Sequence, residues 1–146
     1  MTTEVFISPA ALDAALDHAR RAAPNECVGL LLGRRRAIAE ALPIRSVHPG
    51  PTSFAADPLE LAAGEEDAGR RGLCLCGYYH SHPAAPAVPS DRDRLGEPWP
   101  GLGPSLRMIV SLLDRADPDV RVYASGHNGW KALKWNVAAS TLIAGS

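Results

Sequence analysis

The feature that most constrains the fold is a short apolar run at residues 28–32, Val-Gly-Leu-Leu-Leu, which contains no polar position. A continuous apolar run of this length is typical of a strand whose two faces are both buried. We therefore expect residues 28–32 to form a central strand of a sheet that is covered on both sides. Glu26 lies two positions before the run and is expected at the mouth of this core strand.

The rest of the chain supplies the covering helices and the other strands. Ser8-Pro9 and Asp57-Pro58 are typical helix starts, because the first side chain caps free amides and proline tolerates the first helical position. Alanine and leucine recur at helical spacing after both. Apolar runs predict further strands at residues 5–7, 37–47, 73–79, 106–113 and 120–124, and a final edge strand at residues 130–137. The expected fold is α/β, with a mixed β-sheet sandwiched by helices.

Length and charge point to a single soluble domain, residues 1–146. A chain of 146 residues can bury about two-thirds of its unfolded surface, so it needs no disulfide framework. Its 15 basic and 16 acidic side chains give no electrostatic footprint for nucleic acid or an anionic membrane. The start has no signal-peptide pattern, and no segment approaches the roughly 20 apolar residues of a membrane span, so a cytoplasmic location is expected.

Two other features are interpreted as structural. Cys27, Cys74 and Cys76 are expected to be small buried hydrophobic residues, because cytoplasmic thiols stay reduced and the Cys-Leu-Cys spacing is wrong for a zinc knuckle. The three arginines at residues 34–36 directly follow a glycine and are expected to form a solvated turn.

The residues that can carry chemistry lie at 79–93, with the sequence YHSHPAAPAVPSDRD. His80 and His82 stand at the end of a predicted strand, where alternate side chains share a face, so both imidazoles can chelate one ion. Ser81 must then point to the other face. Ser90 follows a proline and predicts a helix start, with Asp93 one turn into that helix. The short loop therefore returns an aspartate toward the histidine pair.

Two imidazoles and one carboxylate, with a fourth position left to water, compose an open catalytic zinc site rather than a closed structural one. A carboxylate is still needed to take the proton of the attacking water and to deliver it to the leaving amine. Glu26 is the candidate for this role, although alone it would be interpreted as a surface residue that follows a helix. His18, His48 and His127 lie outside the pattern and are interpreted as surface or loop histidines.

These residues resemble the pattern of the JAMM (MPN-plus) metallopeptidase family: a glutamate, His-Ser/Thr-His, seven residues, Ser, two residues and Asp. The seven intervening residues are 83–89, and the similarity extends over roughly residues 4–136. Every position of the pattern is matched here, by Glu26, His80, Ser81, His82, Ser90 and Asp93.

The resemblance implies a cytidine-deaminase-like MPN/JAMM architecture and one Zn²⁺ per chain, bound by His80, His82 and Asp93. It also implies that Glu26 activates a metal-bound water and that Ser90 donates a hydrogen bond to the oxyanion formed during hydrolysis.

The implied reaction is hydrolysis of a peptide or isopeptide bond after the C-terminal Gly-Gly of a ubiquitin-like or sulfur-carrier protein. The short chain is most similar to free-standing prokaryotic members, and among them the CysO-type sulfur-carrier peptidases are slightly favoured. Residues 84–89 and 94–105, the latter with Trp99, are the candidate walls of the substrate cleft.

Two other functions stay open. The domain could be a catalytically silent MPN scaffold or binding module, although the complete ligand set argues against this. A cell-wall or phage-tail-type peptidase is the other alternative, but such relatives often carry an extra cysteine-peptidase domain that 146 residues cannot hold. The sequence does not predict an oligomeric state.

Overall fold

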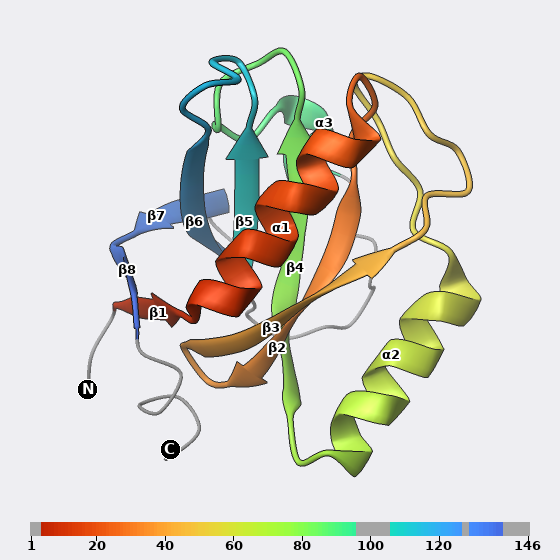
Figure 1. Ribbon diagram of the computed structural model, residues 1–146, viewed down its shortest axis with the longest axis vertical. Coiled ribbons are helices and arrows are strands. Elements are labelled where there is room, and N and C mark those ends of the chain that lie inside the picture. The colour runs from red at the N-terminus through yellow and green to blue at the C-terminus, as the bar shows by residue number, and fades with distance from the viewer. Residues whose placement is uncertain (1–3, 96–105, 127–128, 139–146) are drawn as a thin grey trace.

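The computed structural model describes residues 4–95, 106–126 and 129–138, whose elements are arranged as Figure 1 shows. These elements are β1 (Val5–Ile7), α1 (Pro9–Ala22), β2 (Val28–Arg34), β3 (Ala37–Ile44), α2 (Pro58–Arg70), β4 (Cys74–His82), α3 (Asp91–Leu95), β5 (Leu106–Ser111), β6 (Asp119–Gly126), β7 (Gly129–Leu133) and β8 (Trp135–Val137). Within the described residues the strands form one sheet, in the order β7-β6-β5-β4-β2-β3-β1-β8. The pairs β1–β3, β1–β8 and β4–β5 are parallel and the others antiparallel, so the sheet is mixed.

The helices α1 and α2 pack on opposite faces of this sheet. Ala15 of α1 belongs to the same core cluster as Leu31 of β2, and α1 crosses the front of the sheet in Figure 1. Leu61 of α2 instead belongs to a cluster with Leu30 and Leu32. Side chains alternate along a strand, so β2 is buried on both faces, as its apolar run predicts.

Both predicted helix starts are confirmed. The Ser8 Oγ accepts a hydrogen bond from the Ala11 amide at 3.1 Å, and the Asp57 Oδ1 accepts one from the Leu59 amide at 2.9 Å. Each cap satisfies an amide that has no carbonyl partner within its helix. None of the helices in the described ranges is both long enough and apolar enough to cross a membrane.

The strand β4 holds the central position that matters for function. It pairs antiparallel with β2, where His80 lies opposite Val28, and parallel with β5, where His80 lies opposite Ile109. The strand ends at His82, three residues beyond the predicted end at residue 79. His80 therefore has a paired strand on each side, whereas His82, the last residue of β4, is paired with Ser111 of β5.

The prediction of one edge strand at residues 130–137 is wrong, because this segment forms two strands on opposite edges of the sheet. β7 pairs with β6, whereas β8 pairs with β1. The chain changes partner at Lys134, whose carbonyl accepts a hydrogen bond from the Val5 amide at 2.9 Å. An alternating pattern indicates extended backbone but contains no information on which strands it joins.

Two smaller predictions have mixed outcomes. Cys27 and Cys76 are buried as expected, but Cys74 is exposed. Cys74 is exposed because it is the first residue of β4, whose buried residues start at Cys76. Arg35 and Arg36 form the expected turn between β2 and β3, with Arg35 at a positive φ of 58°.

Candidate metal site

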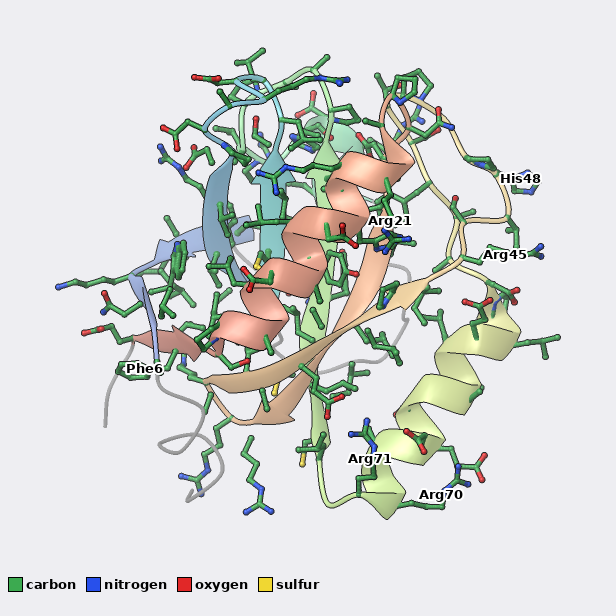
Figure 2. The ribbon with its side chains drawn as sticks, viewed as in Figure 1. Phe6, Arg21, Arg45, His48, Arg70 and Arg71 are labelled. Carbon is green, nitrogen blue, oxygen red and sulfur yellow. The ribbon has the colours of Figure 1, made fainter. Side chains whose placement is uncertain are left out.

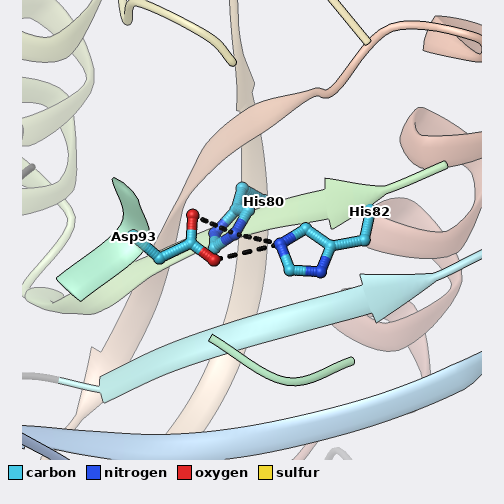
Figure 3. A group of neighbouring side chains, drawn as sticks. All are labelled: His80, His82 and Asp93. Carbon is cyan, nitrogen blue, oxygen red and sulfur yellow. Dashed lines mark hydrogen bonds and ion pairs between the residues drawn. The ribbon is translucent and has the colours of Figure 1, made fainter. Parts of the chain in front are cut away.

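The two histidines predicted as ligands lie side by side on one face of β4. The pleat sends the imidazoles of His80 and His82 to the same side of the sheet. Ser81 points to the other side, where its Oγ accepts a hydrogen bond from the Cys27 amide at 2.8 Å. Both imidazoles converge on the carboxylate of Asp93, which α3 supplies (Figure 3). The structure thus brings together all three residues predicted as metal ligands.

The three side chains lie close enough to bind one metal ion, with one ligand atom of each within 4.8 Å of the others. The two Nε2 atoms of His80 and His82 are 3.2 Å apart. The carboxylate oxygens of Asp93 lie 3.2 Å from the first of these nitrogens and 3.0 Å from the second. A tetrahedral ion with ligand bonds of about 2.0–2.1 Å holds its ligand atoms about 3.3 Å apart. In the described part of the chain this is the one group of three such ligands, and all three are buried.

The hydrogen bond of His82 determines which of its nitrogens can bind a metal. Its Nδ1 lies 2.8 Å from the carbonyl oxygen of Pro86, which can only accept, so Nδ1 carries the proton. When the ring is neutral, its Nε2 presents a lone pair toward the other imidazole and the carboxylate. Two imidazole nitrogens and a carboxylate that are directed at one point are a donor set for a metal ion, so these residues fit a bound ion.

Burial and close contacts shift the pKa values of all three candidate ligands. Burial acts to raise the pKa of Asp93, but its contacts with the two imidazoles and a hydrogen bond from the Ser90 amide hold it well below its usual range. Burial lowers the pKa of His80. Burial also opposes a charge on His82, yet the contacts of its ring with Asp93 and a carbonyl raise its pKa. Asp93 is therefore a carboxylate and offers an anionic ligand.

A reciprocal cap fixes the position of Asp93. The Asp93 amide donates to the Ser90 Oγ at 3.1 Å, and the Ser90 amide donates to the Asp93 Oδ2 at 2.9 Å. This is the helix start that the sequence predicts, and α3 begins at the next residue, Asp91. The Ser90 hydroxyl only accepts in this cap, so its own proton can be donated to another group.

Glu26 lies between α1 and β2, beside the three candidate ligands. Its amide donates to the Gly50 carbonyl at 2.8 Å, which ties it to the loop after β3. Its side chain is buried, with 7% of the residue exposed. Burial raises the pKa of Glu26 to about 7, the nearby His82 acts to lower it and Asp93 acts to raise it. A carboxyl group with this pKa can both accept and return a proton near neutral pH.

A cleft of about 160 Å³ opens beside these residues. Of the predicted walls, residues 84–89 contribute Ala84 and Ala85. The other predicted wall, residues 94–105 with Trp99, lies from residue 96 onward outside the described residues. The loop after β3, which was not predicted as a wall, also contributes. The cleft is lined by Glu26, Pro51, Thr52, His82, Pro83, Ala84, Ala85 and Ser90.

Phe54 is a further site residue that sequence reasoning missed. Its ring packs on the ring of His80, with 5.3 Å between the centroids and 35° between the planes. The contact covers a ligand side chain that is itself 1% exposed. The only signal in the sequence is the position of Phe54 shortly before a predicted helix. This position does not indicate contact with His80, which lies 26 positions further along the chain.

None of the other histidines in the described residues joins the ligand group. His18 is not a surface or loop residue as expected, because it lies within α1, is partly buried and contacts the Tyr79 hydroxyl through Nδ1 at 2.8 Å. His48 is exposed and points away from the sheet (Figure 2). His127 lies outside the described residues.

Comparison with known proteins identifies the family. Prokaryotic homologs of the JAB domain match residues 8–123, a range that runs from the start of α1 into β6 and includes the whole candidate metal site. The chain belongs to this family. The matched range contains α1, β4 and α3, which flank or carry the candidate site residues.

Solved structures support the same fold. A protein from Desulfitobacterium hafniense, determined in solution, has a TM-score of 0.82 at 28% identity, covering 92% of this chain and 93% of that one. A JAB1/MPN domain protein from Archaeoglobus fulgidus has a TM-score of 0.61 at 20% identity, covering 94% of this chain and all of that one. The second likeness concerns the fold alone. The predicted α/β fold with MPN architecture is confirmed.

Two curated proteins similar in sequence are peptidases by name. A probable TtuB-protein conjugate cleaving protease from Thermus thermophilus is 41% identical over 96 residues, which are 65% of this chain and 64% of that protein. A desampylase from Haloferax volcanii is 34% identical over 107 residues, which are 68% of this chain and 77% of that protein. The alignment therefore spans slightly less than two-thirds of the Thermus protein.

Proposed function

We propose that this JAB domain is a zinc-dependent peptidase that hydrolyses the bond after the C-terminal Gly-Gly of a ubiquitin-like protein. The observation that carries the proposal is the convergence of His80, His82 and Asp93 beside a cleft that also contains Glu26 and Ser90. The names of the two similar proteins support a hydrolytic activity. Residues 1–146 are proposed to act as one catalytic domain in the cytoplasm.

One Zn²⁺ per chain is the proposed metal, bound by His80, His82 and Asp93. Two imidazole nitrogens and one carboxylate are a common ligand set of catalytic zinc, which keeps a position open. When bound, the ion polarises the scissile carbonyl and lowers the pKa of water.

Glu26 is proposed to act as the general base and then as the general acid. Its side chain lines the cleft, and burial raises its pKa to about 7, so near neutral pH it is available in both protonation states. As a carboxylate it removes a proton from the attacking water. As a carboxylic acid it returns that proton to the nitrogen of the leaving amine, so that the C–N bond breaks without expelling an amide anion.

Ser90 is proposed to stabilise the oxyanion. It lines the cleft beside Glu26 and His82, and its hydroxyl accepts in the cap of α3, which leaves its proton for donation. A hydrogen bond to an oxygen that gains negative charge is stronger in the transition state than in the ground state. The cap also fixes the Ser90 backbone, so little reorganisation is needed during the reaction.

The lining of the cleft supports a substrate with small residues at the scissile bond. Away from the chemical residues its walls are Pro51, Thr52, Pro83, Ala84 and Ala85, none of which is charged. Glycine lets a substrate backbone approach a buried metal site closely, because it has no Cβ. The names of the similar proteins, a conjugate-cleaving protease and a desampylase, favour a protein conjugate over the sulfur-carrier tail that the sequence slightly favours.

The test is a cleavage assay with two matched substrates. Zinc-loaded protein is incubated with a ubiquitin-like protein whose Gly-Gly is joined to a lysine side chain, and with the same protein extended by a linear peptide. We expect cleavage after Gly-Gly, faster for the lysine conjugate, with loss of activity after chelation and recovery with zinc. Protein that contains one zinc per chain but cleaves neither substrate would contradict the peptidase function and favour the scaffold alternative.

A further inference from the structure

Three consecutive backbone carbonyls in the loop between β4 and α3 are each bound by a side chain of the sheet. The Ser111 Oγ donates to the Ala85 carbonyl at 2.6 Å. The Nδ1 of His82 donates to the Pro86 carbonyl at 2.8 Å. The Tyr123 hydroxyl donates to the Ala87 carbonyl at 2.6 Å. The middle carbonyl is therefore the one that orients a candidate metal ligand.

The three donors come from three neighbouring strands. His82 ends β4 and lies directly opposite Ser111 of β5, and Tyr123 lies on β6. Tyr123 also packs in a small buried cluster with Ala87 and Ile109, so this part of the loop is held down by apolar contact as well. Ser111 is only 2% exposed. The loop is thus bound along the face of the sheet that carries the metal site.

These side chains are what fixes this part of the loop. Within the described residues, no backbone hydrogen bond joins residues 83–89 to the sheet. Proline fixes φ at residue 86, and each peptide unit is planar. With the carbonyls on both sides of it held, the Pro86 carbonyl has little freedom to turn away from the imidazole of His82.

We propose that Ser111 and Tyr123 are positioning residues that fix the Pro86 carbonyl and thereby orient His82 toward the metal. Ser111 and Tyr123 do not line the cleft. Their hydroxyl groups donate to carbonyls of the loop, so they act on His82 through the loop backbone. The Pro86 carbonyl keeps the proton of His82 on Nδ1 and leaves Nε2 for the ion. The inference rests on the proposed function only in that His82 binds zinc.

The test compares the zinc affinity of Ser111→Ala, Tyr123→Phe and the double variant with that of wild type, by competition with a chromophoric chelator. Two matched controls remove equally buried hydroxyl groups elsewhere. Tyr79→Phe removes the hydroxyl that contacts His18 on the other face of β4. Ser8→Ala removes a hydroxyl that donates to the Ala39 carbonyl at 2.7 Å.

We expect the double variant to bind zinc about tenfold more weakly, the lower end of the range for losing a partner of a metal-bound histidine. Each single variant should show part of this loss. The controls should lower the melting temperature of the metal-free protein without changing zinc affinity. If the single variants fold, bind zinc within twofold of wild type and differ from it only in melting temperature, the positioning role is overturned.

The zinc measurement is independent of cleavage. Wild-type protein that binds zinc but cleaves no conjugate would overturn the proposed function, while weaker zinc binding in Ser111→Ala and Tyr123→Phe would still support the positioning role. Conversely, an active wild type with unchanged zinc affinity in both variants would overturn the positioning role alone.

Discussion

The two faces of β4 carry polar side chains of similar type in different surroundings. On the face toward α1, the Tyr79 hydroxyl contacts His18 and the Ser81 hydroxyl accepts from the Cys27 amide, both at 2.8 Å. In both contacts a hydrogen-bond donor meets an acceptor. Gly29 makes room for the tyrosine, because a Cβ at this position would lie 2.1 Å from the ring. This face uses its polar atoms to join helix and strands.

On the opposite face the same strand brings together groups that can all bind one metal ion. His80 and His82 present their Nε2 atoms to each other at 3.2 Å, with the carboxylate of Asp93 beside both. The Nδ1 of His80 is buried and has no hydrogen-bond partner among the described residues. Alternation along one strand therefore separates polar groups that stabilise the fold from the polar groups of the candidate metal site.

Removal of one side chain from each face of β4 tests whether the two faces have separate roles. His82→Ala should abolish stoichiometric zinc binding and reduce hydrolysis to the uncatalysed level, because one of three ligands is lost. Ser81→Ala should keep zinc and activity but destabilise the fold by about 1–3 kcal/mol, since the buried Cys27 amide loses its acceptor. Metal analysis and urea unfolding of both variants test this. Loss of zinc from the serine variant would show that the faces are not separate.

Glu26→Gln tests whether a general base that is not a metal ligand acts beside the candidate metal site. The amide cannot accept the proton of the attacking water, so kcat should fall by about 10²- to 10⁴-fold. Zinc content should stay at one ion per chain, because Glu26 is outside the ligand group. A variant that cleaves at the wild-type rate would remove the base from the mechanism and leave the metal.

Ser90→Ala tests the hydroxyl next to the ligand helix. Loss of one donor to the oxyanion should lower kcat by about 10²-fold. Ser8→Ala is the matched control, because it removes the cap of α1 far from the cleft and should cost about 1 kcal/mol of stability with kcat unchanged. Zinc affinity is measured in parallel. If kcat of the Ser90 variant falls only in proportion to lost zinc, Ser90 acts as a cap alone.

The stability of chelated, metal-free protein should depend on pH through Glu26. Burial raises the pKa of Glu26 from 4.5 to about 7, so its neutral form is favoured in the folded state. The stability from this group is fully present below about pH 4.5 and is lost as the pH rises through 7. The free energy of unfolding of Glu26→Gln should therefore be about 2–3 kcal/mol higher than that of wild type at pH 8, and no higher at pH 4.5. Urea titrations at the two pH values measure the difference, and a gain that does not change with pH would contradict it.

The local geometry of the candidate site follows from the spacing of its residues along the chain. The spacing of His80 and His82 places them on one face, because side chains alternate along a strand, and a single helical turn brings Asp93 into reach of its cap at Ser90. The apolar run of β2 likewise predicts burial on both faces. In each case the relevant neighbours lie within one strand or one turn, where backbone periodicity fixes their direction.

The contacts between distant segments depend on how the strands are ordered and paired in the sheet. Phe54 on the ring of His80 and the hydroxyls of Ser111 and Tyr123 on the loop 83–90 depend on strand order and register, which no local period contains. The same holds for residues 130–137, whose two halves pair at opposite edges of the sheet. The ligands of the proposed metal can thus be read from spacing. The side chains that hold them in place cannot, because long-range pairing brings them there.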